Sequence, residues 1–441
     1  MEAREQWRSS LGFMLAAAGS AVGLGNLWGF PYTASQGGGA AFLLLYVLVV
    51  LVVCLPVLVA EMVLGRSTES SPLIAPIKIG GRLWQPMGWI FVIASCGILA
   101  FYAVVMGWTA DTFFHSLFLG LPKPEEASAF VTSLSTGSSV FLGQLLSLVL
   151  TAVVVSAGVR GGIEKLAKWS MPLLFGLIVI LSIWAATLPG AWAGYKEFLL
   201  DWDLDQLFNP KTIRLAFGQA FFSLSLGIGI MVAYASYSNK KSQLPKEALV
   251  ISGMDTIVGI LAGMVTFPIV MTFLGQGEIQ KSFVQTLFIS LPTGLNSLGL
   301  TGQIVAVLFF GLAFIAALTS AVSLLEVPVS SLIDRFGWNR NQAVIFSTSL
   351  IFLIGIPAAL SDKILEDMDT YTKLFLQLGG FLICILMGWF STRKYDEDLA
   401  GCNSKIGVRR YLKFMLRWVS PIAIGFGLYV SVYDLVKPAI T

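Results

Sequence analysis

Two stretches of the sequence place glycines beside oxygen-bearing side chains in the middle of apolar runs. The first is GSAVGLGN, from Gly19 to Asn26, and the second is SLSLGIG, from Ser223 to Gly229. Glycines at this density interrupt a helix and free backbone carbonyls, and such oxygens suit a hard cation such as sodium. Half-helix N-termini suit a carboxylate. The alternative is a helix-packing seam, since Gly19 and Gly23 form a GxxxG pair.

Residue counts exclude several other kinds of site. His115 is the only histidine, so the sequence supplies neither a histidine-based catalytic centre nor a histidine-rich metal site. The four cysteines are scattered without metal or disulfide spacing and are interpreted as buried free thiols. There is no HExxH motif, no pair of intramembrane aspartates and no Ser-His set. We therefore expect no enzyme.

The composition determines which elements must position these residues. Hydrophobic residues make up 56% of the 441 and charged residues only 12%, against about 25% charged residues in soluble proteins. So few charges cannot cover a globule that faces water. The sequence predicts an all-α polytopic membrane protein, with the lipid bilayer as its surroundings and no nucleic-acid partner.

Eleven apolar runs are long enough to cross a bilayer, which takes about 20 residues of helix. They lie near residues 11–33, 41–64, 87–118, 141–157, 166–188, 213–236, 249–275, 300–333, 342–360, 370–391 and 411–436.

Orientation follows from the distribution of lysine and arginine. With the N-terminus inside, most of the 28 lysines and arginines fall in loops on the inner side. An odd number of spans then places the C-terminus outside. We expect a multi-pass protein of the cell (inner) membrane with a cytoplasmic N-terminus.

The two interrupted stretches occupy the first and the sixth span. They are interpreted as the first helices of two five-helix halves, residues 1–190 and 205–391, followed by a cytoplasmic loop and an eleventh helix in 392–441. An odd number of spans per half inverts the second half relative to the first. Interruptions at equivalent positions favour a cavity over a packing seam, because unwound backbone is tolerated in a membrane only where it lines a cavity.

Four segments resemble the neurotransmitter:sodium symporter family in its bacterial amino-acid branch. They are GSAVGLGNLWGFP (Gly19–Pro31), QAFFSLSLGIG (Gln219–Gly229), YASY (Tyr234–Tyr237) and AALTS (Ala316–Ser320). The likeness covers essentially the whole chain. It implies the LeuT-type fold, a 5+5 inverted repeat in which helices 1 and 6 are unwound.

The resemblance implies two sodium ions. The first site would use Ala21, Asn26, Ser223 and Asp255, together with the substrate carboxylate. The second would use the carbonyls of Gly19, Val22 and Ala316 with the hydroxyls of Thr319 and Ser320. All-oxygen ligands with few formal charges suit a monovalent hard ion.

The resemblance also implies a substrate pocket. It would be lined by Ser20, Ala21, Gly23, Gly25, Ile98, Tyr102, Phe222, Ser223, Ser225, Ile228, Ser320 and Leu324. Tyr102 would bind the substrate carboxylate, and Phe222 would close over it as a lid. Gly23 stands where monoamine carriers have an aspartate, so an α-amino acid is favoured. The apolar wall of Ile98, Phe222, Ile228 and Leu324 offers no hydrogen bonds to a polar substrate side chain.

The gates are implied by the same likeness. Arg4 with Asp334 would close the inner side, assisted by Trp7, Ser236 and Tyr237. Tyr102, Phe222 and Asp369 would close the outer side. Glu61 is an intramembrane carboxylate for which we expect a partner.

The sequence departs from the family pattern at four places. Gly29 replaces the usual arginine, so the outer ion pair to Asp369 loses its usual partner. Ser20 replaces a common asparagine, position 259 is glycine, and the twelfth helix is missing. Because Asp255 stands where an asparagine ligand is usual, it is expected to supply the negative charge that other members take from chloride.

These observations predict a sodium-coupled symporter that imports neutral hydrophobic L-amino acids by alternating access, without chloride. It is expected to be a monomer or a weak homodimer. The alternative is an amino-acid sensor or receptor that kept the fold and lost transport. Gly29 is the residue that most favours this alternative.

Overall fold

The computed structural model describes residues 5–123, 125–273, 275, 286–402 and 404–440, and within these the chain forms helices and no strands. Here η marks a short π or 3-10 turn. The first half of the chain contains α1 (Ser10–Ala21), η1 (Gly25–Gly29), α2 (Phe30–Gln36), α3 (Ala40–Val49), η2 (Val50–Cys54), α4 (Leu55–Thr68), α5 (Ala75–Gly80), η3 (Arg82–Trp84), α6 (Gln85–Phe118), α7 (Ala127–Ser135), α8 (Ser138–Ser156), η4 (Val159–Ile163), α9 (Glu164–Ala185), α10 (Ala191–Tyr195), η5 (Lys196–Leu200) and η6 (Leu204–Phe208). The second half contains α11 (Pro210–Ser223), α12 (Ile230–Ala235), α13 (Leu244–Phe273), η8 (Thr286–Ser290), α15 (Leu291–Asn296), α16 (Leu300–Phe336), α17 (Arg340–Leu360), α18 (Asp362–Ile385), η9 (Leu386–Phe390), α19 (Thr392–Gly401), α20 (Ile406–Phe414), η10 (Met415–Val419) and α21 (Ser420–Ile440).

The number of membrane spans differs slightly from the sequence-based prediction. Within the described residues, nine helices are long and apolar enough to cross a membrane, and α1 with η1 and α2 makes a tenth when the bent pair is taken as one span. The predicted sixth span corresponds to α11 and α12. Each of these is too short to cross alone, because six residues between them are not helical. The polytopic all-α prediction is confirmed, and the count of eleven stays a prediction.

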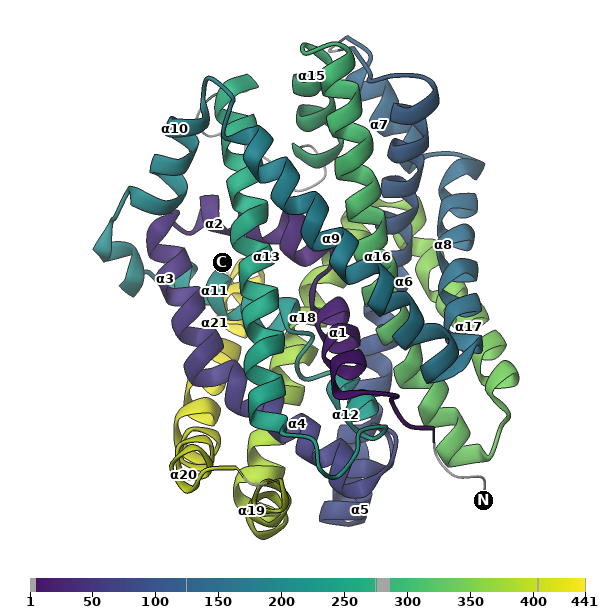
Figure 1. The fold of residues 1–441 in the computed structure, drawn as a ribbon, viewed down its shortest axis with the longest axis vertical. Coiled ribbons are helices and arrows are strands. Elements are labelled where there is room, and N and C mark those ends of the chain that lie inside the picture. Colours follow the sequence, from purple (N-terminus) through teal and green to yellow (C-terminus); the bar gives the residue numbers. More distant parts are fainter. Residues whose placement is uncertain (1–4, 124, 274, 276–285, 403, 441) are drawn as a thin grey trace.

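The short helices separate to the two ends of the molecule. In Figure 1, α7, α10 and α15 lie at the upper end, whereas α5, α19 and α20 lie at the lower end. The first three follow odd-numbered predicted spans, and α5 and α19 follow even-numbered ones. This is the segregation expected of a chain that crosses a bilayer repeatedly. Between the ends, α16 packs along α6, and α1 lies against α9, α13 and α16.

The first broken span bends because its backbone turns extended at the glycine-rich stretch. Val22, which follows α1, has φ −78° and ψ 100°, and the next segment leaves at 57° to α1. The side chain of Asn26 reaches back across the break, and its Oδ1 accepts from the amide of Gly23 at 3.2 Å. An oxygen-bearing side chain thus satisfies a backbone group that the helix has released.

The second break, between α11 and α12, depends on glycine. Gly227 has φ +80°, and a Cβ on it would lie 1.8 Å from the carbonyl oxygen of Leu376. A side chain is therefore excluded by both conformation and space. Ser225 also has a positive φ, of 52°. The amide of Gly227 donates to Glu61 Oε1 at 2.6 Å, so the buried carboxylate of α4 supports the unwound segment. This supplies the partner expected for Glu61.

Candidate functional site

A central cavity lies between the two broken spans and brings the predicted pocket residues together. Its lining consists of Ser20, Ala21, Gly23, Gly25, Ile98, Tyr102, Phe222, Ser223, Ser225, Ile228, Ser320, Leu324 and Leu376. All twelve predicted residues line it, and Leu376 of α18 is the one that the sequence reasoning missed.

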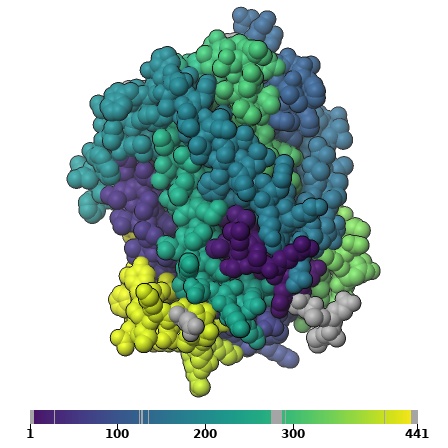
Figure 2. Space-filling model, in the orientation of Figure 1, coloured from purple at the N-terminus to yellow at the C-terminus, as the bar shows by residue number. Residues whose placement is uncertain are grey.

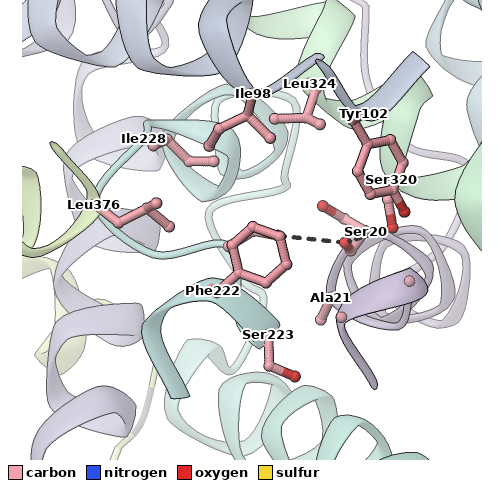
Figure 3. Close-up of a pocket in the computed structure, with 13 residues that line it drawn as sticks. Ser20, Ala21, Ile98, Tyr102, Phe222, Ser223, Ile228, Ser320, Leu324 and Leu376 are labelled. Atoms are coloured by element: carbon pink, nitrogen blue, oxygen red, sulfur yellow. Dashed lines mark hydrogen bonds between the residues drawn. The ribbon is translucent and has the colours of Figure 1, made fainter. Parts of the chain in front are cut away.

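The cavity has an apolar side and a polar side. Figure 3 shows Ile98, Ile228, Leu324 and Leu376 on one side of the Phe222 ring. On the other side lie Tyr102 and Ser320, together with Ser20 and Ala21 at the end of α1. This arrangement suits an occupant with one polar end and one apolar end, because a polar group placed against the apolar wall would lose its hydrogen bonds to water.

The polar side is crowded at Gly23. A Cβ on Gly23 would lie 2.5 Å from Ser320 Oγ and 2.8 Å from the hydroxyl oxygen of Tyr102. The same hydroxyl accepts from the amide of Leu24 at 3.2 Å. Glycine therefore lets the unwound backbone approach both hydroxyls, and an acidic side chain at this position would overlap them.

One side of the first break holds a group that we call the acidic oxygen cluster: Asn26, Ser223, Asp255 and Tyr46. Asp255 Oδ1 accepts from Asn26 Nδ2 at 2.6 Å and from Ser223 Oγ at 2.7 Å, and Oδ2 accepts from the Tyr46 hydroxyl at 3.0 Å. Asp255 and Asn26 are both fully buried. Among the described residues, no lysine or arginine pairs with this carboxylate. Ala21, the fourth predicted ligand, lines the adjoining cavity.

The other side holds the neutral oxygen cluster, defined by Gly19, Val22, Ala316, Thr319 and Ser320. Ser320 Oγ lies 3.5 Å from the carbonyl oxygens of both Gly19 and Val22. Thr319 Oγ1 donates to the carbonyl of Ala316 at 2.9 Å. All five oxygens are neutral. Those of Gly19 and Val22 lie in the last turn of α1 and directly after it, and the other three lie on α16.

Beside the Phe222 ring, at one end of the cavity, lies an ion pair within one helix. Lys373 Nζ lies 2.5 Å from Asp369 Oδ2, one turn away on α18, and 5.4 Å from the centre of the Phe222 ring. Lys373 also lines a second pocket, together with Gln219. Asp369 thus has a cationic partner although Gly29 cannot supply one.

Aromatic and charged side chains meet where Trp7 contacts the segment from Tyr234 to Tyr237. Trp7 Nε1 donates to the carbonyl of Tyr234 at 2.8 Å, and the Trp7 amide donates to the carbonyl of Tyr237 at 3.1 Å. The Tyr237 hydroxyl donates to Glu326 at 2.7 Å, and Glu326 pairs with Arg340 at 2.5 Å. Glu326 and Arg340 were missed because neither belongs to a motif.

The predicted inner gate is described only in part. Asp334 Oδ2 accepts from the amide of Ser71 at 2.6 Å, and Ser236 is buried beside Tyr237 with its hydroxyl on the carbonyl of Ala233. Arg4 lies outside the described residues. Its pairing with Asp334 stays a prediction.

Comparison with known proteins relates the whole chain to one family. Residues 4–140 and 126–440 match the model of the sodium:neurotransmitter symporter family. A sodium-dependent transporter of Bacillus subtilis, YhdH, is 38% identical over 95% of this chain and 96% of its own length. The sodium-dependent nutrient amino acid transporter 1 of Drosophila persimilis is 27% identical over 98% of this chain and 75% of its own.

A solved structure is similar over nearly the same extent. The crystal structure of MhsT in complex with L-phenylalanine superposes with a TM-score of 0.89, at 37% identity, and the match covers 97% of this chain and 100% of that one.

Proposed function

The chain belongs to the sodium:neurotransmitter symporter family, has its LeuT-type fold and is a multi-pass membrane transporter, and we propose that it imports neutral hydrophobic L-amino acids together with sodium. The observation that carries this proposal is the buried Asp255 carboxylate beside the central cavity. A buried charge without an ionic partner is costly, and a bound cation offsets that cost.

The substrate would lie across the cavity between its two sides. Its carboxylate would meet the Tyr102 hydroxyl and the unwound backbone near Gly23, and its side chain would face Ile98, Ile228 and Leu376. The wall favours leucine, isoleucine, valine, methionine and aromatic amino acids. A neighbour solved with L-phenylalanine supports this substrate class.

Two sodium ions would accompany the substrate. The first would bind in the acidic oxygen cluster, with Asn26, Ser223 and Asp255 turning their oxygens to the ion and Ala21 adding its carbonyl. The second would bind in the neutral oxygen cluster and join α1 to α16. Because Asp255 brings its own negative charge, transport would not need chloride.

Alternating access would proceed by opening the two ends of the cavity in turn. At the outer end, Phe222 would act as the lid and Tyr102 would hold the substrate beneath it. Lys373, paired with Asp369, would steady the ring through its positive charge. At the inner end, Trp7 and the residues around Tyr237 would separate.

We place the inner side at the lower end of Figure 1, where α19 and α20 carry many cations. The N-terminus would then lie in the cytoplasm and the C-terminus outside, in the cell membrane. Residues 1–190 and 205–391 would form the two inverted halves. The chain would act as a monomer or weak homodimer.

The alternative is an amino-acid receptor without transport. Its support was the loss of a partner for Asp369, and the contact between Lys373 and Asp369 weakens that argument. Uptake of labelled leucine into proteoliposomes, with an inward sodium gradient and without one, separates the two functions. Accumulation that requires the gradient supports the symporter. Sodium-dependent binding without accumulation would establish the receptor instead.

A competition panel tests the substrate class in the same assay. Isoleucine, methionine and phenylalanine should displace labelled leucine, because their side chains fit the apolar wall. Glutamate, lysine and a decarboxylated amine should not. Stronger competition by any of these three than by unlabelled leucine would contradict the proposed pocket.

A further inference from the structure

Arg417 lies against two tryptophans at the lower end of the molecule. Its guanidinium carbon is 4.5 Å from the centre of the Trp389 ring and 5.8 Å from that of Trp418. The two indole rings are 4.7 Å apart and nearly perpendicular. We call these three residues the Arg417 cluster. Their arrangement holds a cation in a fixed aromatic setting.

The cluster is built where two helical irregularities pack together. Trp389 belongs to η9 at the end of α18, and Arg417 and Trp418 belong to η10. Trp389 Nε1 donates to the carbonyl of Arg417 at 3.0 Å. Gly388 permits the approach, since a Cβ there would lie 3.2 Å from the carbonyl oxygen of Leu416. The Trp389 ring is therefore positioned by a backbone contact, and the guanidinium lies against that ring.

The segment around the cluster has more cations than carboxylates. Between Trp389 and Ser420 the sequence has seven lysines and arginines and three carboxylates. All three carboxylates already have partners: Asp396 with Lys413, Glu397 with Arg393 and Asp398 with Arg66.

Five cations remain without a carboxylate among the described residues: Lys394, Lys405, Arg409, Arg410 and Arg417. Arg417 Nε and Arg409 Nε are buried and have no hydrogen-bond acceptor in the described part of the chain. A cation with an unused donor beside an excess of like charge calls for an anion.

Exposed apolar side chains stand on the segments that carry the cluster and on those next to them. Trp389, Phe390, Phe414, Trp418 and Ile422 are all exposed, and Ile422 has 70% of its surface free. Figure 2 shows this C-terminal segment, in yellow, on the surface of the lower end. Tryptophan rings collect at the boundary between headgroups and hydrocarbon. A soluble anion would use the cations and leave these apolar side chains exposed, whereas a phospholipid would use both.

We propose that the Arg417 cluster and the neighbouring cations bind the headgroup of an anionic phospholipid, with its acyl chains along the exposed apolar side chains of η9, η10 and α21. The phosphodiester would accept from the guanidinium of Arg417, whose planar fork matches two phosphate oxygens. Lys405, Arg409 and Arg410 would favour a headgroup with net negative charge over a zwitterionic one. This site is separate from the central cavity and does not depend on the transported substrate.

Native mass spectrometry of the full chain in detergent tests the assignment, with phosphatidylglycerol or phosphatidylcholine added at equal concentration. The wild type should retain phosphatidylglycerol preferentially. In Arg417→Gln, retention should fall by about fivefold, the factor that one basic side chain contributes at an anionic surface. Arg393→Gln is the matched control, because Arg393 lies in the same segment but is exposed and paired with Glu397.

Arg417→Lys keeps the charge and removes the planar fork, so it should retain an intermediate amount of phosphatidylglycerol. This second variant keeps the test valid if Arg417→Gln does not fold. Equal retention of the two lipids by the wild type would overturn the proposal. Unchanged phosphatidylglycerol retention in both Arg417 variants would overturn it too. If soluble glycerol phosphate displaced the lipid at matched concentration, the site would be one for free anions and the lipid assignment would be wrong.

Discussion

The acidic and the neutral oxygen clusters flank the same broken helix, yet they are built from different ligands. Asp255 places a formal charge in the first, and three hydrogen-bond donors surround it. The second consists of carbonyls and hydroxyls around Thr319 and Ser320 and carries no charge. Without a bound cation, the first cluster therefore carries the free-energy cost of an unpaired buried charge, and the second cluster carries no such cost.

This difference in ligands predicts different roles for the two proposed sodium ions. An ion beside Asp255 gains Coulomb energy at low dielectric and sits next to the substrate cavity, so it would set affinity for substrate. An ion beside Ser320 gains less energy, but its ligands come from α1 and α16. It would set the relative position of these helices. The variants below change either a charge or a neutral oxygen in or near these two clusters.

The largest effect is expected for Asp255→Asn, which keeps the shape and removes the charge. The loss of about 4 kcal/mol of attraction at an effective dielectric constant near 20 corresponds to about a thousandfold lower sodium affinity. Uptake of labelled leucine should therefore vanish in chloride-free gluconate buffer. Added chloride should restore part of it, because an anion can then supply the missing charge.

Two results would contradict this interpretation of Asp255. One is equal uptake by the wild type and Asp255→Asn in gluconate. The other is wild-type uptake that requires chloride, since the carboxylate is proposed to make chloride unnecessary.

A smaller loss is expected when the neutral cluster is altered by Thr319→Ala with Ser320→Ala. Each neutral oxygen contributes about 1.5 kcal/mol to holding a charged partner, so both changes together should weaken sodium binding by about a hundredfold. Ser331→Ala is the control, since its hydroxyl bonds to Val327 within the same helix. Sodium-driven uptake measured over a range of sodium concentrations would show the shift. Normal uptake by the double variant at low sodium would exclude the second site.

Much of this comparison could be predicted from the sequence, because glycine-rich breaks and their oxygen-bearing neighbours are local features. The family resemblance supplied the pocket residues from Ser20 to Leu324, and all of them line one cavity. Nine of the twelve lie in the motifs that carry the resemblance, whereas Ile98, Tyr102 and Leu324 lie outside them. Leu376 could not be found this way. It lies in a helix without a motif, and only packing brings it to the cavity.

The partners of charged residues were harder to predict, since they depend on tertiary structure. The spacing of Asp369 and Lys373 permits an i,i+4 pair on a helix. Nothing in the spacing indicates that Lys373 lies over Phe222, which is distant in the sequence. Likewise, the breadth of the second break made α11 and α12 individually shorter than a membrane span.

Lys373→Met tests a carboxylate that, unlike Asp255, already has a cationic partner: Asp369 pairs with Lys373. Removing the lysine leaves Asp369 unpaired near the entrance and frees the Phe222 ring. A partly exposed ion pair contributes at most about 1 kcal/mol, so the KM for leucine should rise by up to about fivefold. Lys373→Arg should restore the wild-type KM, because it retains both charge and ring contact. A KM unchanged in Lys373→Met would show that the pair does not act on the lid.

The smallest effect on transport is expected for Gly259→Ser, which adds a hydroxyl one turn after Asp255 on α13. The change tests whether a neutral hydroxyl at this position or the charge of Asp255 decides the need for an anion. A Cβ at Gly259 would lie 3.2 Å from the Phe30 ring, and the ring must shift to admit it. Overpacking of this kind costs about 1–3 kcal/mol in stability. The melting temperature should fall, whereas Gly253→Ser, which has open space on the same helix, should leave it unchanged.

Uptake by Gly259→Ser in gluconate should persist, because Asp255 still provides the negative charge and a second anion beside it would be repelled. If Gly259→Ser made uptake depend on chloride, the hydroxyl rather than the carboxylate would control the anion requirement, and the charge contrast between the two clusters would lose its explanation.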